Sequence, residues 1–318
     1  MTGSKIAVVA IGGNSLIKDK QHQTVEDQYE AARETAHHIA EMIAEGWNVV
    51  IGHGNGPQVG FILRRSEIAH KVEGMHEIPL DVCGADSQGA IGYALQQNLQ
   101  NELQKRGIQK SVTTVVSQVL VDRNDPAFKS PSKPIGGFMD HSEAQRRANE
   151  MDWTVVEDAG RGWRRVVPSP LPKEVVEFAA IKALVEAGVT VIAVGGGGIP
   201  VVDTGNRQYR GIAAVIDKDF ASSLLAQLLN ADLLLISTAV EKVAINFGKP
   251  DQEWVSRMTV SEVKKYLSEG THFAKGSMEP KMKAIAWFLE SGGKQAIVTN
   301  PENIGRALKG ETGTLIGP

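Results

Sequence analysis

Short apolar runs that end in glycine constrain this chain more than any other feature. Lys5 to Ile11, Trp47 to Ile51 and Val189 to Val194 each read as a buried β-strand. The glycines that follow them are Gly12-Gly13, Gly52 to Gly56 and Gly195 to Gly198. A helix is predicted over Thr24 to Glu45, between the first two runs, with Thr24 and Asp27 as a capping box. Strand–helix–strand order predicts a parallel sheet with right-handed crossovers.

The three glycine turns indicate where a ligand binds. In open parallel α/β sheets, ligands lie beyond the carboxyl ends of the strands. Glycines at those ends let backbone N–H groups approach phosphate oxygens closely. The turns therefore favour a phosphate-rich ligand. The chain has no GxxxxGK[ST] motif and no GxGxxG that runs from a strand into a helix, which disfavours a P-loop fold and a dinucleotide dehydrogenase.

A further stretch, Gly211 to Asp232, places a lysine beside carboxylates at the start of a helix. Ile212 to Ile216 are expected to form a short strand, and Asp217 to cap the helix that follows. Lys218 and Asp219 then fall in the first helical turn. A lysine there opposes the helix dipole, so its presence indicates a strongly negative ligand. A solvated lysine on a capped surface helix is the alternative.

The rest of the chain divides by composition. A helix is predicted over Gln88 to Lys105 and a strand over Ser111 to Val121. Asp122 to Pro172 are rich in proline, glycine, arginine and tryptophan and have weak periodicity. That stretch predicts an inserted lobe outside the main sheet. Further strands are expected at Leu233 to Ser237, Gln295 to Thr299 and Thr314 to Ile316.

Bulk composition narrows the class of protein. The 318 residues, 42% of them hydrophobic, suit one large α/β domain or two lobes. A net charge of −3 gives no basic excess for a nucleic-acid or membrane surface. A single cysteine, Cys83, fits a reducing compartment. The first apolar run is too short for a signal peptide, so a cytoplasmic protein is expected. His53, in the second glycine turn, is expected to contact the loop and not a metal.

These stretches resemble the amino acid kinase family, and within it the carbamate kinase branch, over essentially the whole chain. The runs that carry the resemblance are AIGGN (Ala10 to Asn14), GHGNGPQVG (Gly52 to Gly60), FKSPSKPIG (Phe128 to Gly136), EDAGRGW (Glu157 to Trp163), VIDKDFAS (Val215 to Ser222) and GSMEPK (Gly276 to Lys281). One departure is Thr238-Ala239-Val240-Glu241, where the family often has aspartate.

The resemblance implies a fold and a substrate for each of its two lobes. The expected fold is a three-layer αβα sandwich with a mainly parallel, open sheet of about eight strands and a small protruding subdomain. Residues 1–216 would form the lobe on the carbamate or carbamoyl phosphate side, with residues 122–172 as its inserted lobe. Residues 217–318 would form the nucleotide side. A homodimer is also implied.

The implied reaction is reversible phosphoryl transfer, ATP + carbamate = ADP + carbamoyl phosphate, run toward ATP synthesis in arginine breakdown. Carbamate is already an anion, so the barrier is charge repulsion, which lysines, backbone N–H groups and Mg²⁺ must offset. Phosphate oxygens and water would hold most of the metal, and no protein ligand is assigned. Alternatives are another family member that acts on an acyl group or nucleoside monophosphate, and a non-catalytic nucleotide-binding sensor.

The resemblance also assigns residues. Lys218 and Lys281 would contact the transferring phosphoryl group from opposite sides, and Asp219 would hold both lysines. Lys133, in the inserted lobe, would reach over the acceptor. Gly12, Gly13 and Asn14 would bind the phosphoryl group, Gly54, Asn55 and Gly56 the carbamoyl end, and Phe247 and Met278 the adenine. Arg161, Arg164 and Arg165 are predicted to make structural ion pairs.

Overall fold

The main element of the fold is one eight-stranded sheet, seen in a computed structural model that describes residues 5–12, 24–157 and 162–318. In spatial order its strands are β15 (Arg257–Thr259), β17 (Thr314–Gly317), β16 (Gln295–Thr299), β12 (Leu233–Ser237), β1 (Ile6–Ile11), β2 (Asn48–His53), β9 (Thr190–Ile192) and β3 (Val112–Thr114). Neighbouring strands are parallel, except β16 and β17. The prediction of a mainly parallel sheet of about eight strands is confirmed.

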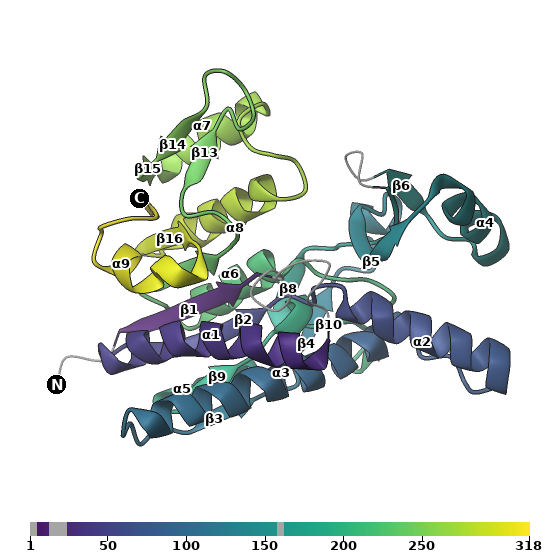
Figure 1. The fold of residues 1–318 in the computed structure, drawn as a ribbon, viewed down its shortest axis with the longest axis horizontal. Coiled ribbons are helices and arrows are strands. Elements are labelled where there is room, and N and C mark those ends of the chain that lie inside the picture. The colour runs from purple at the N-terminus through teal and green to yellow at the C-terminus, as the bar shows by residue number, and fades with distance from the viewer. Residues whose placement is uncertain (1–4, 13–23, 158–161) are drawn as a thin grey trace.

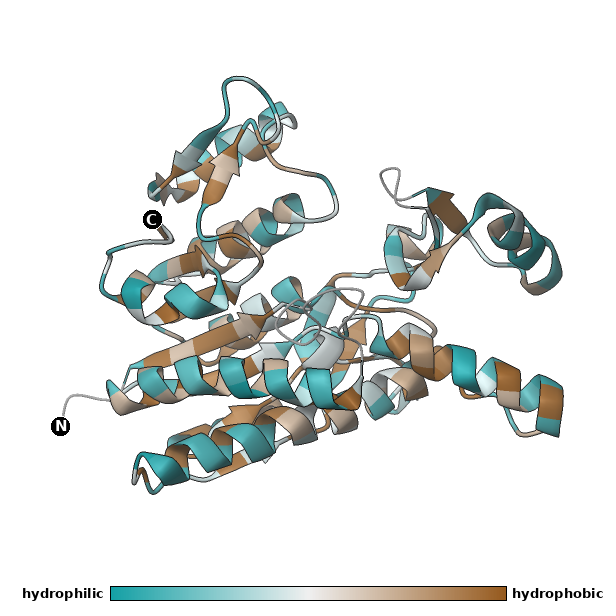
Figure 2. Ribbon diagram, in the orientation of Figure 1, coloured by the Kyte–Doolittle hydropathy of each residue, from teal (hydrophilic) through white to brown (hydrophobic). Residues whose placement is uncertain are grey.

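Helices cover both faces of this sheet. Along β1, Ala7, Val9 and Ile11 join one buried apolar cluster, whereas Val8 and Ala10 join the cluster on the opposite face. The first face is covered by α1 (Val25–Ala44), α3 (Leu80–Lys105) and α9 (Ile304–Leu308), and the second by α5 (Phe178–Glu186), α6 (Lys218–Leu228), α7 (Val260–Glu269) and α8 (Met278–Glu290). Burial on both faces explains the continuous apolar runs, which stand out along β1 in Figure 2. The three-layer αβα prediction is confirmed.

The inserted lobe stands apart from the main sheet. It contains a separate three-stranded sheet and the helix α4 (His141–Met151). In spatial order the strands are β5 (Lys133–Met139), β7 (Trp163–Val167) and β6 (Val155–Glu157), after a short helix η2 (Pro126–Phe128). Figure 1 shows β5, β6 and α4 projecting beyond the main sheet, on the same side as α2 (Gln58–Glu73). The backbones of α2 and β5 lie so close together that a side chain at Gly60 would collide with the backbone of Gly136.

The prediction of one strand over Ser111 to Val121 is wrong. β3 ends at Thr114, and β4 (Gln118–Val121) belongs to a four-stranded sheet of order β11-β10-β4-β8. Buried Ser117 holds the bend, because its Oγ donates to Val115 O at 2.7 Å and accepts from Val194 N at 3.0 Å. The other strands of that sheet are β8 (Pro172–Val175), β10 (Ile199–Asp203) and β11 (Tyr209–Gly211).

Ile212 to Ile216 do not form the predicted strand either. Ile212 N donates to Pro200 O at 3.1 Å, whereas Val215 N donates to Pro168 O at 2.9 Å. Because the two ends bond to different segments, no ladder forms, and the stretch is apolar because it is mostly buried. The remaining elements are the hairpin of β13 (Val243–Ile245) and β14 (Glu253–Val255) and the short helices η3 (Gly195–Gly197) and η4 (Pro301–Asn303). Among the described helices, none is both long and apolar enough to span a membrane.

Candidate active site

Two lysines meet one carboxylate at the start of α6. Asp217 caps this helix as predicted, since its Oδ1 accepts from Asp219 N at 2.8 Å. Lys218 Nζ donates to Asp219 Oδ1, and Lys281 Nζ, from the first turn of α8, donates to Asp219 Oδ2 at 3.0 Å. Asp219 is only 2% exposed. The alternative of solvated surface lysines is therefore wrong.

A third lysine reaches the same place from the inserted lobe. Lys133, the first residue of β5, has its Nζ 2.5 Å from Asp217 Oδ2. The groups border a cavity of about 180 Å³, which we call the lysine pocket. It is lined by Lys133, Asp217, Lys218, Asp219 and Lys281 together with Gly54, Asn55, Gly56, Gly196, Gly276 and Ser277. Sequence reasoning gave Asp217 only a capping role and missed its pairing with Lys133.

The charges of the lysine pocket perturb one another. Burial alone would raise the pKa of Asp217, but the ammonium groups of Lys133 and Lys218 outweigh it and hold that pKa well below its usual value. Burial lowers the pKa of Lys218 by more than Asp219 restores, and the charge of Lys281 adds to the lowering. Burial opposes a charged Lys281, yet Asp219 raises its pKa. Three ammonium groups against two carboxylates leave the pocket suited to an anion.

Residues of the second and third glycine turns line this pocket. Gly54 N donates to Ile11 O at 2.9 Å, which joins the second turn to the end of β1. Gly12 N donates to Ser237 O at 3.0 Å at the end of β12. In the third turn Gly196 has a φ of +67°, and a side chain there would collide with the Asn55 amide. Only glycine lets this turn approach so closely. Gly13 and Asn14 lie outside the described residues.

Two buried polar residues of α3 support the turns from behind. Ser87 Oγ donates to Asn55 Oδ1 at 2.7 Å. Gln88 Nε2 donates to Gly195 O at 2.9 Å, and its Oε1 accepts from Ser117 N at 2.8 Å. Sequence reasoning missed both residues, since it began the helix at Gln88 when α3 begins at Leu80. A Ser-Gln pair directly before the buried apolar face of that helix was the available signal.

His53 contacts its own loop, as expected. Its Nδ1 lies 3.0 Å from Gly54 O, and the ring is fully buried. Burial lowers its pKa to about 4, so the ring is neutral at pH 7. A side chain at Gly195 would collide with Nε2, which fixes how the ring faces the third turn. The described residues include no cluster of three or more His, Cys, Asp or Glu side chains that could hold a metal.

Other predicted residues lie elsewhere. Phe247 follows β13 and is 57% exposed, Met278 begins α8, and neither lines the lysine pocket. Arg165 pairs with Glu67 at 3.8 Å, which confirms the predicted ion pair, while Arg164 lies over the Phe138 ring and donates to Gly136 O at 3.0 Å. Arg161 lies outside the described residues.

Comparison with known proteins settles the family. The profile of the Amino acid kinase family matches residues 5–300. The chain belongs to the amino acid kinase family. Its relatives in that family include the carbamate kinase-like protein YahI of Escherichia coli, 54% identical with 98% of each chain covered. The carbamate kinase of Thermococcus kodakarensis is 50% identical, over 98% of this chain and 99% of that protein.

A solved structure of the amino acid kinase family agrees with the whole fold. The carbamate kinase of Giardia lamblia bound to AMP-PNP superimposes with a TM-score of 0.90 and 42% identity, over 100% of this chain and 99% of that one. AMP-PNP is an ATP analogue, so that relative binds a nucleotide. The fold class predicted from the sequence is thereby confirmed.

Proposed function

We propose that this chain catalyses reversible phosphoryl transfer between ATP and carbamate, which yields ADP and carbamoyl phosphate. The observation that carries the proposal is the pairing of Lys218 and Lys281 with the two oxygens of Asp219, beside Gly54 to Gly56. Phosphoryl transfer needs positioning and charge neutralisation more than covalent chemistry. Relatives of similar length that carry the name carbamate kinase support this choice of reaction.

Lys218 and Lys281 bind the transferring phosphoryl group in this mechanism. They come from two different helices, and Asp219 sets the spacing of their ammonium groups. Carbamate carries its own negative charge, so no general base is needed to make it a nucleophile. The lysines instead lower the repulsion between two anions as their oxygens approach. Gly54, Asn55 and Gly56 border the carbamoyl end in this proposal. The Gly54 N–H already donates to Ile11 O, so the donors there are the Asn55 side chain and the Gly56 amide.

Lys133 joins the site from the inserted lobe. In the structure its ammonium group pairs with Asp217. An entering carbamoyl phosphate offers the same ammonium group a more negative partner within the lysine pocket. Lys133 then contacts the acceptor, which brings β5 over the substrate. The inserted lobe, 122–172, would act as the cover of the acceptor site.

The nucleotide binds on the side of residues 217–318 in this proposal. Phe247 and Met278 border the adenine, and Gly12, Gly13 and Asn14 face the phosphoryl group. Both pocket carboxylates already pair with lysines, so Mg²⁺ that accompanies ATP or ADP would be coordinated mainly by phosphate oxygens and water. Bound there, Mg²⁺ supplies further neutralisation of phosphate charge. Residues 1–216 form the acceptor side.

The cellular setting is also part of the proposal. We propose a cytoplasmic homodimer that makes ATP from carbamoyl phosphate during arginine breakdown. The net charge of −3 and the single cysteine suit the cytoplasm. The dimer and the direction of the reaction rest on the resemblance to the carbamate kinase branch.

Coupled measurement of ATP formation from ADP and carbamoyl phosphate tests the reaction. We expect robust turnover with this pair. Acetylglutamate or UMP with ATP should give none. Turnover of either of those two would assign the chain to another reaction of the family. ADP binding without turnover of any acyl phosphate would instead identify a nucleotide sensor.

A further inference from the structure

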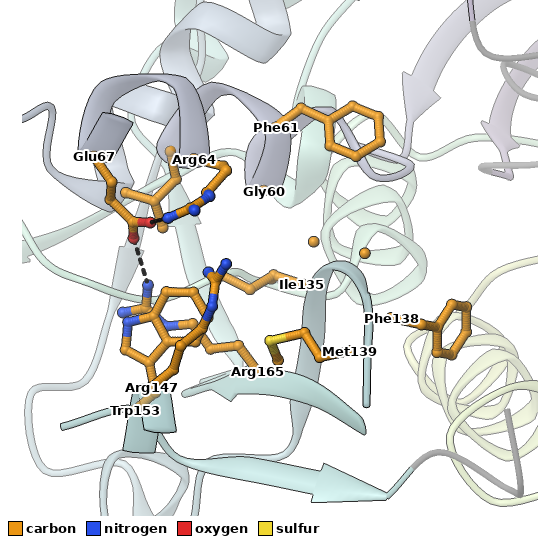
Figure 3. Close-up of a pocket in the computed structure, with 13 residues that line it drawn as sticks. Gly60, Phe61, Arg64, Glu67, Ile135, Phe138, Met139, Arg147, Trp153 and Arg165 are labelled. Carbon is orange, nitrogen blue, oxygen red and sulfur yellow. Dashed lines mark hydrogen bonds and ion pairs between the residues drawn. The ribbon is translucent and has the colours of Figure 1, made fainter. Parts of the chain in front are cut away.

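A second cavity, separate from the lysine pocket, lies between α2 and the inserted lobe. It has a volume of about 230 Å³, and we call it the arginine cavity. Gly60 and Gly136, whose backbones touch, both line it. Figure 3 shows guanidinium groups gathered around Trp153, below the helix that carries Glu67. The cavity is thus bounded on one side by α2 and on the other by the inserted lobe.

Positive charge exceeds negative charge in this cavity. Among the described residues that line it, Arg64, Arg147 and Arg165 carry guanidinium groups and only Glu67 a carboxylate. Glu67 pairs with Arg64 at 3.3 Å and with Arg165 at 3.8 Å. Arg147 pairs at 2.6 Å with Glu143, a neighbour on its own helix that does not line the cavity. Among the described residues of the lining, guanidinium groups therefore outnumber carboxylates by two, and Glu143 offsets part of the charge of Arg147 from outside the cavity.

Arg147 and Arg165 both lie over the ring of Trp153. Their guanidinium carbons lie 4.8 and 4.5 Å from the ring centroid of Trp153. Burial lowers the pKa of Arg165, and the charge of Arg147 adds to that lowering. The ion pair of Arg165 with Glu67 is longer than a hydrogen bond. An anion bound in the cavity beside these guanidinium groups would offset their charge and accept their N–H donors.

The rest of the lining sets the shape of the ligand. Phe61, Leu63, Ile135 and Met139 add apolar side chains to the cavity. A bare inorganic ion would leave that surface uncovered. Guanidinium groups match the two oxygens of a carboxylate in a fork geometry. A flat apolar body attached to the carboxylate would cover the aliphatic and aromatic lining.

We propose that the arginine cavity is a second binding site, for an organic carboxylate with an apolar body. The carboxylate accepts hydrogen bonds from Arg147 and Arg165, which both line the cavity, and the apolar body lies toward α2. Such a ligand bridges α2 and the inserted lobe. Ile135 lines both this cavity and the lysine pocket, two residues from Lys133. A ligand bound in the arginine cavity therefore contacts β5, the strand that carries Lys133.

Benzoate binding to the full-length protein tests the proposal, with no turnover required. Calorimetry measures affinity, and tryptophan fluorescence reports on Trp153. We expect saturable binding of benzoate and none of benzamide, which has the same shape without the charge. Arg147→Gln and Arg165→Gln should each weaken benzoate by at least about tenfold. Glu67→Gln should tighten it, because the competing carboxylate is gone.

Arg207→Gln is the matched control. Arg207 pairs with Glu174, and neither residue lines the cavity or pairs with a residue that does, so its loss should leave benzoate affinity unchanged. A second control, Lys281→Ala, keeps the arginine cavity while removing a lysine of the other pocket. Equal benzoate affinity in wild type, Arg147→Gln and Glu67→Gln overturns the proposal. So does loss of benzoate binding in Lys281→Ala alone, because the anion would then occupy the lysine pocket.

Discussion

The lysine pocket and the arginine cavity both gather cations, yet they hold them in different ways. In the lysine pocket each ammonium group lies within hydrogen-bond distance of a carboxylate, and Asp219 serves two of them. Among the described residues that line the arginine cavity, Glu67 is shared by Arg64 and Arg165, and its pair with Arg165 is 3.8 Å long. The first arrangement fixes positions, and the second leaves charge to be met by a ligand.

The two sites also differ in the residues and elements that surround them. Buried Ser87, Gln88 and His53 contact the glycine turns that line or adjoin the lysine pocket. The arginine cavity is bounded on one side by the small sheet and helix of the inserted lobe. Fixed charges on a rigid support suit catalysis, where groups must be placed before the reaction begins. Charges at a boundary between two parts suit a ligand that joins them.

Lys281→Ala should produce the largest effect, because it removes a fixed charge from the lysine pocket. We expect kcat for ATP formation to fall about a thousandfold, as for loss of a preorganised charge at a transition state. The affinity for ADP should change little. Lys283→Ala is the control, since Lys283 lies two residues along α8, is exposed and pairs with Glu279. Normal turnover in Lys281→Ala would end its assigned role.

Lys133→Ala tests the charge that arrives from the inserted lobe. We expect kcat/KM for carbamoyl phosphate to fall about a hundredfold, because the acceptor loses one cation and Asp217 loses its partner. Steady-state kinetics with varied carbamoyl phosphate and a separate ADP titration check this. Lys129→Ala, at an exposed site earlier in the lobe, should behave as wild type. Loss of ADP affinity alone would show that Lys133 contacts ADP and not carbamoyl phosphate.

Local patterns mark the glycine turns and Lys218 of the lysine pocket, whereas Lys133 and Lys281 were assigned to it by the family resemblance. Glycines after strands and a lysine after a capping aspartate are readable within a few residues. Sequence reasoning missed the pairing of Lys133 with Asp217, 84 residues apart, because no local pattern records such a contact. For the same reason the bend at Ser117 and the unpaired run before Asp217 were predicted as strands. Their apolar residues are buried by neighbours that the sequence does not reveal.

His53 tests whether the support behind the lysine pocket excludes charge. Its pKa is about 4 in the folded protein and 6.5 as the ordinary value. Between these values the unfolded state binds more protons, so stability falls as pH falls through that window. From pH 7.5 to pH 5 His53 should contribute a loss of about 2 kcal/mol in the free energy of unfolding. His53→Asn, which does not titrate, should remove that share of the loss in urea titrations. An unchanged pH dependence would show that His53 is not buried as a neutral ring.

Ser87→Ala should have the smallest effect, and it tests positioning without removing any charge. The hydroxyl holds Asn55 Oδ1 at 2.7 Å, and its loss frees that amide to turn. We expect KM for carbamoyl phosphate to rise about fivefold, as for one hydrogen bond of about 1 kcal/mol, while KM for ADP stays constant. A purely structural role would lower thermal stability and leave the ratio of the two KM values unchanged. Equal changes in both KM values would therefore show that Ser87 supports the fold and does not position Asn55. The lysine pocket would then lack the positioning support that distinguishes it from the arginine cavity.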